Sequence, residues 1–201
     1  MYGFFLDTGA FDFGRRVDMK VKEVLLSAAD MLGVYESVKN AFEGVNAENN
    51  KETETLLRCF NLVENAVAID YLPLKAEDVV YSDSGKIAFS ELSSAPVRIL
   101  GVSDVAGNPT RFSLFPDFIK TEAGKRVVLY TYAPKEKSLE DDSDFVTYIS
   151  SRVLAYGVCA EYCTACGLYE QASVWDGKYK EALRAALRST KCKVLATRRW
   201  A

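Results

Sequence analysis

Apolar residues in the first third of the chain recur at helical spacing. Between residues 20 and 32 they stand three or four positions apart, which predicts an amphipathic helix ended by Gly33. A shorter helix is expected at Tyr35–Phe42 and a longer one at Lys51–Tyr71, which Pro73 stops. This pattern predicts that the chain begins as a helical bundle.

The period of the apolar residues changes to two between Leu74 and Pro134. Residues 79–81 and 87–89 flank Ser-Asp-Ser-Gly-Lys at 82–86, which predicts a β-hairpin. Further strands are expected at residues 97–102, 111–115 and 125–132. The last of these is rich in β-branched and aromatic residues. We therefore expect four or five short antiparallel strands in one small sheet, with one face covered by the helices.

The helical spacing returns after the acidic run at residues 140–144. Carboxylates in a first turn complement the positive end of a helix, so this run predicts the start of a third helix that reaches Cys166. Gly167 breaks it, and a fourth helix is expected at residues 169–188. The short break favours an antiparallel helical hairpin.

The predicted fold class is α+β, mainly an α-helical bundle of about four helices with a small antiparallel β insertion between helices 2 and 3. Residues 1–18 have no helical or strand period, and either Met19 is the natural start or they form a flexible arm. The predicted segments are a flexible N-terminal arm (1–18), a helical part (19–72), an inserted β part (73–137), a C-terminal helical hairpin of the same bundle (138–189) and a basic C-terminal arm (190–201).

Composition excludes several classes of site. The 201 residues are 49% hydrophobic and include no histidine, so triads and zinc sites built on imidazole are excluded. Phosphate-binding loops of the P-loop and dinucleotide-binding types are absent from the sequence. No apolar run approaches the ~20 residues of a membrane span. Because no export signal precedes the first helix, we expect the five cysteines to stay reduced in a cytosolic setting.

Charge is distributed unevenly along the chain. The net charge is −3, yet residues 178–201 carry +7, which leaves −10 on the preceding part. A basic arm on an acidic body indicates an acidic partner surface or a phosphate backbone near the chain end. The alternative is a solvated helix face with a frayed tail.

One motif resembles a metal site: Cys159-x3-Cys163-x2-Cys166, the spacing with which radical S-adenosylmethionine enzymes hold a four-iron cluster. In those enzymes the motif precedes a long barrel, for which this chain has no room downstream. On a helix, Cys159 and Cys166 are about 10.5 Å apart along the axis, too far to share one zinc ion. We therefore interpret the three cysteines as a packed helix face, and keep a metal or iron–sulfur protein, with Cys59 or Cys192, as the alternative.

Other candidate groups have ordinary structural interpretations. The acidic run at 140–144 could bind a divalent cation, but a helix start explains it better. Lone acids on the predicted helices are expected to be solvated or paired with nearby bases: Glu64, Asp70 and Glu161. Three phenylalanines near basic residues could stack on nucleic-acid bases but are expected in the core: Phe112, Phe115 and Phe118.

The stretch from residue 152 to residue 183, with Trp175 and Tyr179 on its second helix, resembles the closing helical hairpin of tailed-phage head–tail adaptor proteins. The wider layout of helices, β part and helices also resembles the tail-tubular type of adaptor and prophage-encoded proteins of this length. Residues 96–100 and 127–132 mark the β part in this resemblance.

The resemblance implies a structural virion protein, with neither enzymatic activity nor a cofactor. Such adaptors form a ring, twelve-fold in the family, that docks under the portal protein, continues the DNA channel and presents a platform to tail or stopper proteins. DNA passes through without sequence-specific binding, and the protein is cytoplasmic in the host before assembly. Docking on the portal is expected from the C-terminal arm: Lys191, Lys193, Val194, Leu195, Arg198, Arg199 and Trp200. A nucleic-acid-binding regulatory protein that uses the same arm is a further alternative.

Overall fold

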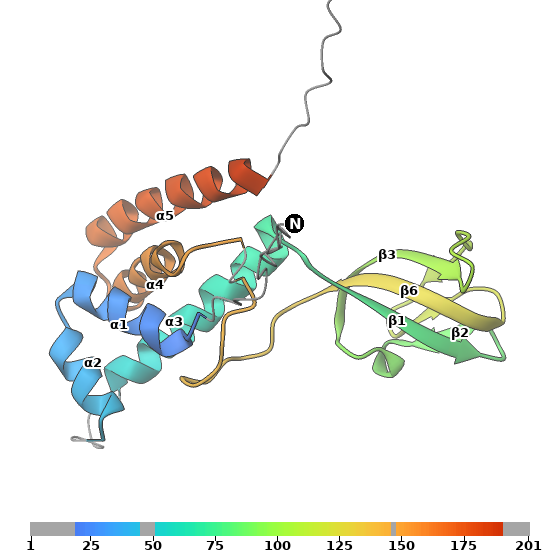
Figure 1. Cartoon of the computed structure of the whole chain (residues 1–201), viewed down its shortest axis with the longest axis horizontal. Helices are drawn as coiled ribbons and strands as arrows, with labels where there is room; N and C mark the ends of the chain where they lie inside the picture. The colour runs from blue at the N-terminus through green and yellow to red at the C-terminus, as the bar shows by residue number, and fades with distance from the viewer. Residues whose placement is uncertain (1–18, 45–50, 146–147, 191–201) are drawn as a thin grey trace, which may run out of the picture.

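The protein is seen in a computed structural model that describes residues 19–44, 51–145 and 148–190. These residues form a helical lobe and a β lobe, and the β lobe projects from the end of α3 (Figure 1). The helical lobe holds α1 (Val21–Leu32), α2 (Tyr35–Phe42), α3 (Lys51–Ala66), a π-helical turn (Val67–Tyr71), α4 (Ser151–Ala165) and α5 (Tyr169–Thr190). The β lobe holds β1 (Leu74–Ser82), β2 (Lys86–Ala88), a 3-10 turn (Phe89–Glu91), β3 (Pro96–Asp104), β4 (Ser113–Leu114), β5 (Phe118–Lys120) and β6 (Gly124–Tyr132).

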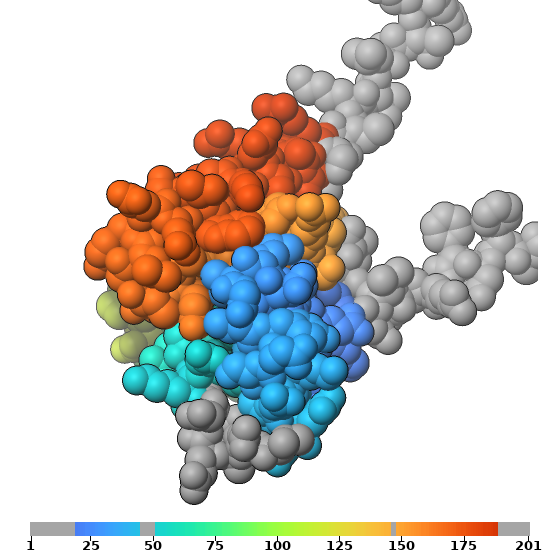
Figure 2. Space-filling view, turned by 90° about the vertical axis from the view of Figure 1, so that its left-hand side faces the viewer, coloured from blue at the N-terminus to red at the C-terminus, as the bar shows by residue number. Residues whose placement is uncertain are grey.

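The core of the helical lobe lies around α4, which packs against α1, α3 and α5. The apolar stripes read from the sequence face this core, including Val24 and Leu25 of α1 and Phe60 of α3, all fully buried. The closest approach is at Gly157 of α4, where an added Cβ would lie 2.7 Å from Cγ1 of Val63. Seen from the end away from the β lobe, α2 lies beside α1, with the start of α3 below and the α4–α5 hairpin above (Figure 2).

Most of the predicted helices are confirmed. Helix α1 ends at Gly33, whose φ of 75° is the left-handed conformation that glycine adopts without strain. Helix α3 begins at Lys51 as predicted and continues to Tyr71, although its last five residues are π-helical. Gly167, with φ of 77°, breaks the chain between α4 and α5.

The β lobe is a sandwich of two three-stranded antiparallel sheets, in the orders β1–β6–β3 and β2–β5–β4. Its core is separate from that of the helices and combines residues of both sheets, such as Ile87, Ile119 and Val128. The fully buried Tyr130 donates its hydroxyl to Oδ2 of Asp78 at 2.7 Å, which satisfies the one polar group of that side chain.

The predicted fold class is therefore wrong in its main features. The described residues form five helices rather than a bundle of about four, and the six strands form two sheets that make a lobe of their own after α3. The inner face of β1–β6–β3 is covered by the second sheet and not by helices. The residues of the β lobe supply enough apolar side chains for a core of their own. The sequence did not predict this core because polar and apolar residues alternate imperfectly along the strands.

The predicted hairpin across residues 82–86 is also wrong. Strand β1 pairs with β6 and β2 pairs with β5, so the turn at 82–86 carries the chain from one sheet to the other. Gly85 is needed there, because its φ is 70° and a Cβ would collide with the carbonyl oxygen of Thr121.

The acidic run at residues 140–144 does not open a helix. Helix α4 begins at Ser151, and the acidic residues lie in an irregular connection of turns and bends in which their side chains have other partners. Asp141 accepts hydrogen bonds from the backbone N–H and the hydroxyl of Ser138, and Asp144 pairs with Lys137 at 2.9 Å. These local contacts outweigh the benefit of carboxylates in a first helical turn.

Candidate interaction surface

The C-terminal docking residues predicted between Lys191 and Trp200 lie outside the described residues, as does the predicted N-terminal arm. The structure does place the two residues that carry the resemblance in the hairpin. Tyr179 is buried against Gly157 of α4, and the Trp175 ring lies 5.8 Å from that of Tyr156. Lys178 covers the Trp175 ring at 4.3 Å. Both aromatic residues therefore hold α5 against α4.

The cysteines of the Cys159-x3-Cys163-x2-Cys166 motif are only partly a packed face. Cys159 and Cys163 are fully buried, and Cys159 donates a weak hydrogen bond to the carbonyl oxygen of Ala28 at 3.6 Å. Cys166, however, is exposed at the end of α4, so the prediction is wrong for this residue. Burial raises the pKa of Cys159 to about 12 and that of Cys59 on α3 to about 11. Burial thus disfavours the thiolate form of both side chains.

Within the described ranges, the structure brings no three residues among His, Cys, Asp and Glu together in a group that could hold a metal ion. The described helices include none that is long and apolar enough to cross a bilayer.

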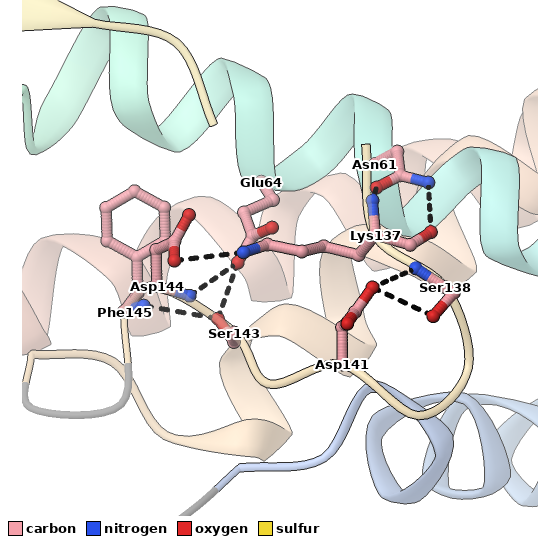
Figure 3. Close-up of polar contacts among 8 residues, drawn as sticks. All are labelled: Asn61, Glu64, Lys137, Ser138, Asp141, Ser143, Asp144 and Phe145. Atoms are coloured by element: carbon pink, nitrogen blue, oxygen red, sulfur yellow. Dashed lines mark hydrogen bonds and ion pairs between the residues drawn. The ribbon is translucent and has the colours of Figure 1, made fainter. Parts of the chain in front are cut away.

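A polar cluster fixes the segment that returns from the β lobe, which we call the return segment (residues 133–145), on α3 (Figure 3). Asn61 makes two hydrogen bonds to the backbone of Lys137: its Oδ1 accepts from the N–H at 2.8 Å, and its Nδ2 donates to the carbonyl at 3.1 Å. One turn later on α3, Oε1 of Glu64 accepts from the Ser143 hydroxyl at 2.7 Å and from the Asp144 N–H at 2.9 Å. Two side chains one turn apart on α3 therefore hold the return segment at residues 137 and 143–144.

Glu64 is the least expected member of this cluster. The sequence predicted a solvated or paired acid, but the side chain is 1% exposed and is held by hydrogen bonds, so that prediction is wrong. Desolvation by burial raises the pKa of the Glu64 carboxyl above its ordinary value, although the bonds from Ser143 and Asp144 and the charge of Lys137 act against this. Its second oxygen, Oε2, is buried and has no hydrogen-bond partner among the described residues. Asp70 and Glu161, by contrast, are exposed as predicted.

The return segment also contacts the start of α1. The N–H of Val21 donates to the carbonyl of Asp141 at 3.0 Å, and the N–H of Ser143 donates to the carbonyl of Met19 at 3.0 Å. Lys20 and Asp142 add an ion pair at 3.1 Å. The segment thus satisfies backbone groups at a helix start, where N–H groups have no partner within the helix, and it ties α1 and α3 to the chain that leaves the β lobe.

A second feature is the outer face of the β1–β6–β3 sheet, the face turned away from the second sheet. Along β1, exposed and less exposed residues alternate, and Val79 and Tyr81 are 55% and 65% exposed on the outer face. The register places Val79 opposite Val127 and Tyr81 opposite Lys125, and Leu129 continues the apolar surface along β6. This face therefore carries a small apolar patch beside Lys75, Glu77 and Lys125, and the described part of the chain leaves it open to solvent.

A groove lies at the junction of the two lobes. Exposed Ile69 from the end of α3 and exposed Val97 and Leu100 from β3 line a groove of about 190 Å³. Lys75 and Arg98 are the charged residues of its lining. A surface that spans two strands and the end of a helix offers more contact area than scattered single residues would.

The three phenylalanines of the β lobe differ in exposure. Phe112 packs partly against the core of the lobe, as predicted. Phe115 is 42% exposed, and its ring stacks on that of Phe118 with centroids 4.5 Å apart. Lys86 lies 4.1 Å from the centroid of the Phe118 ring. Phe115 is thus a surface residue held by an intramolecular stack, and the core prediction is wrong for it.

Sequence reasoning missed the polar cluster and the outer face. The signal for the cluster was Glu64 itself, an acid between Val63 and Val67 on the apolar stripe of a helix. The signal for the outer face was the alternation in β1, where Val79 and Tyr81 continue the side of the strand that begins with Lys75 and Glu77.

The chain matches no known protein family, and no curated protein has a detectably similar sequence.

Proposed function

We propose that this protein is a structural subunit of a head–tail adaptor ring in a tailed phage or prophage. In this role it docks under the portal protein, continues the DNA channel and presents a platform to tail or stopper proteins. The proposal starts from the resemblance of residues 152–183 to the closing hairpin of such adaptors. Trp175 and Tyr179, which carry that resemblance, join α4 to α5 and so have a defined structural role.

The observation that carries the proposal is the division of the described residues into two lobes with separate cores, joined by a segment that is fixed on the helical lobe. An adaptor must contact one partner above and another below, so it needs two distinct contact surfaces. Here the return segment is held on α3 by Asn61 and Glu64 and on α1 by Val21. Contacts of this kind fix on the helical lobe the segment by which the chain returns from the β lobe, which suits a platform carried on a stable base.

The charge distribution supports the same role. The chain before residue 178 carries a net charge of −10, and DNA is densely negative, so an acidic body around a channel would not retain the passing genome. The +7 of residues 178–201 is available for an acidic groove on a protein partner.

The test is binding to the portal protein of the same genome. The full chain is mixed with purified portal rings, and the complex is examined by electron microscopy and native mass spectrometry. We expect a second ring of several copies below the portal, and no binding to the portal of an unrelated phage, which serves as the control. Absence of binding to the cognate portal at moderate salt, or a genome without portal and capsid genes near this one, would overturn the proposal.

A further inference from the structure

We infer that the outer face of the β2–β5–β4 sheet binds single-stranded nucleic acid, with a base stacked on Phe115 and backbone phosphate held by Lys86 and Lys120. We call this surface the stacking face. It is formed by Lys86, Ala88, Ser113, Phe115, Phe118 and Lys120. The inference goes beyond the proposed function, which gives this sheet no role, and it does not depend on that function.

The register of the strands shows which side chains share the stacking face. Ile87 and Ile119 are fully buried in the core between the two sheets, so their neighbours along β2 and β5 lie on the outside. Lys86 lies directly opposite Lys120 in this register, and Ser113 of β4 lies opposite Lys120 on its other side. One row across the face therefore carries two adjacent cations.

The next row of the same face carries two stacked rings. Phe118 stands two positions before Lys120 on β5, and the N–H of Phe115 donates to the carbonyl of Phe118 at 2.9 Å. The two rings are parallel within 5°, and Nζ of Lys86 lies 4.1 Å from the centroid of the Phe118 ring. Because Phe118 covers one face of the Phe115 ring, a base would stack on the opposite face, as bases do on exposed aromatic side chains.

An open hollow of about 710 Å³ adjoins the Phe115 ring. Phe115, Lys120 and Arg111 are among the residues that line it. Glu122, the acid among the described residues of this lining, is already paired with Arg126 at 3.1 Å. The hollow thus brings an aromatic ring and two cations to one place, which is the combination that a base and its phosphate require.

The charges of the stacking face favour an anionic ligand. Like charges directly opposite each other on neighbouring strands destabilise a sheet. Neither Lys86 nor Lys120 is ion-paired within the described ranges. Asp117 lies in the turn between β4 and β5, outside the two rows. A phosphate bound between the two lysines would remove their repulsion.

The chemistry of the face selects a single strand over a duplex. Stacking on a side chain needs a base whose ring face is free, whereas the bases of a duplex are stacked on one another. The β lobe, residues 74–132, has seven basic and seven acidic residues, so it does not share the negative net charge of the chain before residue 178. Capture of a single strand on this lobe is therefore compatible with passage of duplex DNA along the acidic helical part.

The first test measures binding of the full chain to a labelled twelve-nucleotide oligothymidine by fluorescence anisotropy. Phe115→Ala removes the stacking ring, and Phe115→Trp keeps an aromatic ring in its place. The matched control is Tyr81→Ala, which removes an exposed aromatic ring from the outer face of the other sheet. We expect Phe115→Ala to weaken binding at least roughly fivefold, and the other two variants to bind as the wild type does. A labelled hairpin duplex should bind more weakly, and its affinity should not change in Phe115→Ala.

The second test concerns the phosphate contacts. The double variant Lys86→Gln with Lys120→Gln is compared with Lys75→Gln and Lys125→Gln, which removes the same charge from the other sheet. Affinity for the oligothymidine is measured between 50 and 200 mM salt. Loss of two phosphate contacts should lower the slope of log affinity against log salt by about 1.4, and the control should keep the wild-type slope.

Three results would overturn the inference. The first is a wild-type chain that does not bind the oligothymidine at 50 mM salt. The second is wild-type affinity in Phe115→Ala, which would assign the binding to basic residues elsewhere in the chain. The third is displacement of the oligothymidine by an equal concentration of thymidine monophosphate, which would show a pocket for one nucleotide. If Phe115→Ala does not fold, the lysine pair decides, and an unchanged salt slope would refute the site. None of these measurements involves the portal, so failure of this inference is distinguishable from failure of the adaptor function.

Discussion

Glu64 gives the sharpest test of how the return segment is held on the helical lobe. We compare two substitutions at this position. Glu64→Ala removes the acceptor of the Ser143 hydroxyl and the Asp144 N–H. Glu64→Gln keeps an oxygen in that position and removes only the charge. The exposed Glu54 of the same helix provides the control, Glu54→Gln.

The magnitude for Glu64→Ala follows from the contacts that it removes. A buried donor left without an acceptor costs about 1–3 kcal/mol, and two donors are affected here, in addition to the cavity that the side chain leaves. We therefore expect the free energy of unfolding to fall by about 2–5 kcal/mol. For a chain of this length, 1 kcal/mol corresponds to roughly 2–4 °C, so the melting midpoint should fall by roughly 4–20 °C.

The Glu64→Gln variant tests the raised pKa. An acid whose pKa is higher in the folded state binds its proton more tightly there than in the unfolded chain. Its contribution to stability is complete below the unfolded value of 4.5 and is lost as the pH rises through the raised value. Glutamine does not titrate, so the stability of wild type relative to Glu64→Gln should be greatest in acid and should decrease as the pH rises.

The measurement is a set of urea unfolding curves from pH 4 to pH 8, followed by circular dichroism at 222 nm, which reports the helical lobe. All other titrating groups are common to both proteins and cancel in the difference. A difference that stays constant across this range, or that grows with pH, would refute the raised pKa. A Glu64→Ala variant as stable as Glu54→Gln would refute the structural role of the cluster.

Three further predictions concern other parts of the molecule. Gly157→Ala should destabilise the fold by about 1–3 kcal/mol in urea unfolding, because the new methyl group would lie 2.7 Å from a methyl of Val63. The control Gly177→Ala has open space around the new methyl group and should stabilise the fold by up to ~1 kcal/mol. If both substitutions changed the free energy of unfolding equally, the close packing at Gly157 would be contradicted. In thiol titration of the native full chain, a Cys166→Ser variant should lose a fast-reacting thiol whereas Cys159→Ser should not, since only Cys166 of the two is exposed. The reverse order would show that Cys159, and not Cys166, faces solvent. Deleting residues 190–201 should leave the melting temperature unchanged and abolish binding to the cognate portal in a pull-down. Unfolding of the truncated protein would show that these residues belong to the folded core, and full binding would show that the docking surface lies elsewhere.

Local patterns predicted the elements whose stabilising contacts are close in sequence. The stripe of α1 with Gly33 at its end, and the stripe of α3 with Pro73 beyond it, needed only apolar spacing and one residue that stops a helix. The acidic run at 140–144 misled the same reasoning, since its position resembles a helix start while its partners lie elsewhere in the structure.

The sheets and the polar cluster could not be predicted in this way because their partners are distant in sequence. Strand β1 is completed by β6, about fifty residues later, and β2, β4 and β5 have only two or three residues each, too few for a period to be recognised. Glu64 and Ser143 are 79 positions apart. A buried acid on an apolar stripe shows that some partner exists, but the identity of that partner depends on the tertiary fold.

The two ends of the β lobe lie side by side, and this makes the lobe an interchangeable unit. Leu74 and Tyr132 are paired across β1 and β6, so their Cα atoms are only about 5 Å apart, the spacing of facing residues in an antiparallel pair. A turn of a few residues could therefore join α3 directly to the return segment and leave the core of the helical lobe intact. By the same geometry, a different domain with neighbouring ends could be inserted at this point. Evolution or design could thus change what the projecting lobe recognises without rebuilding the helices that support it.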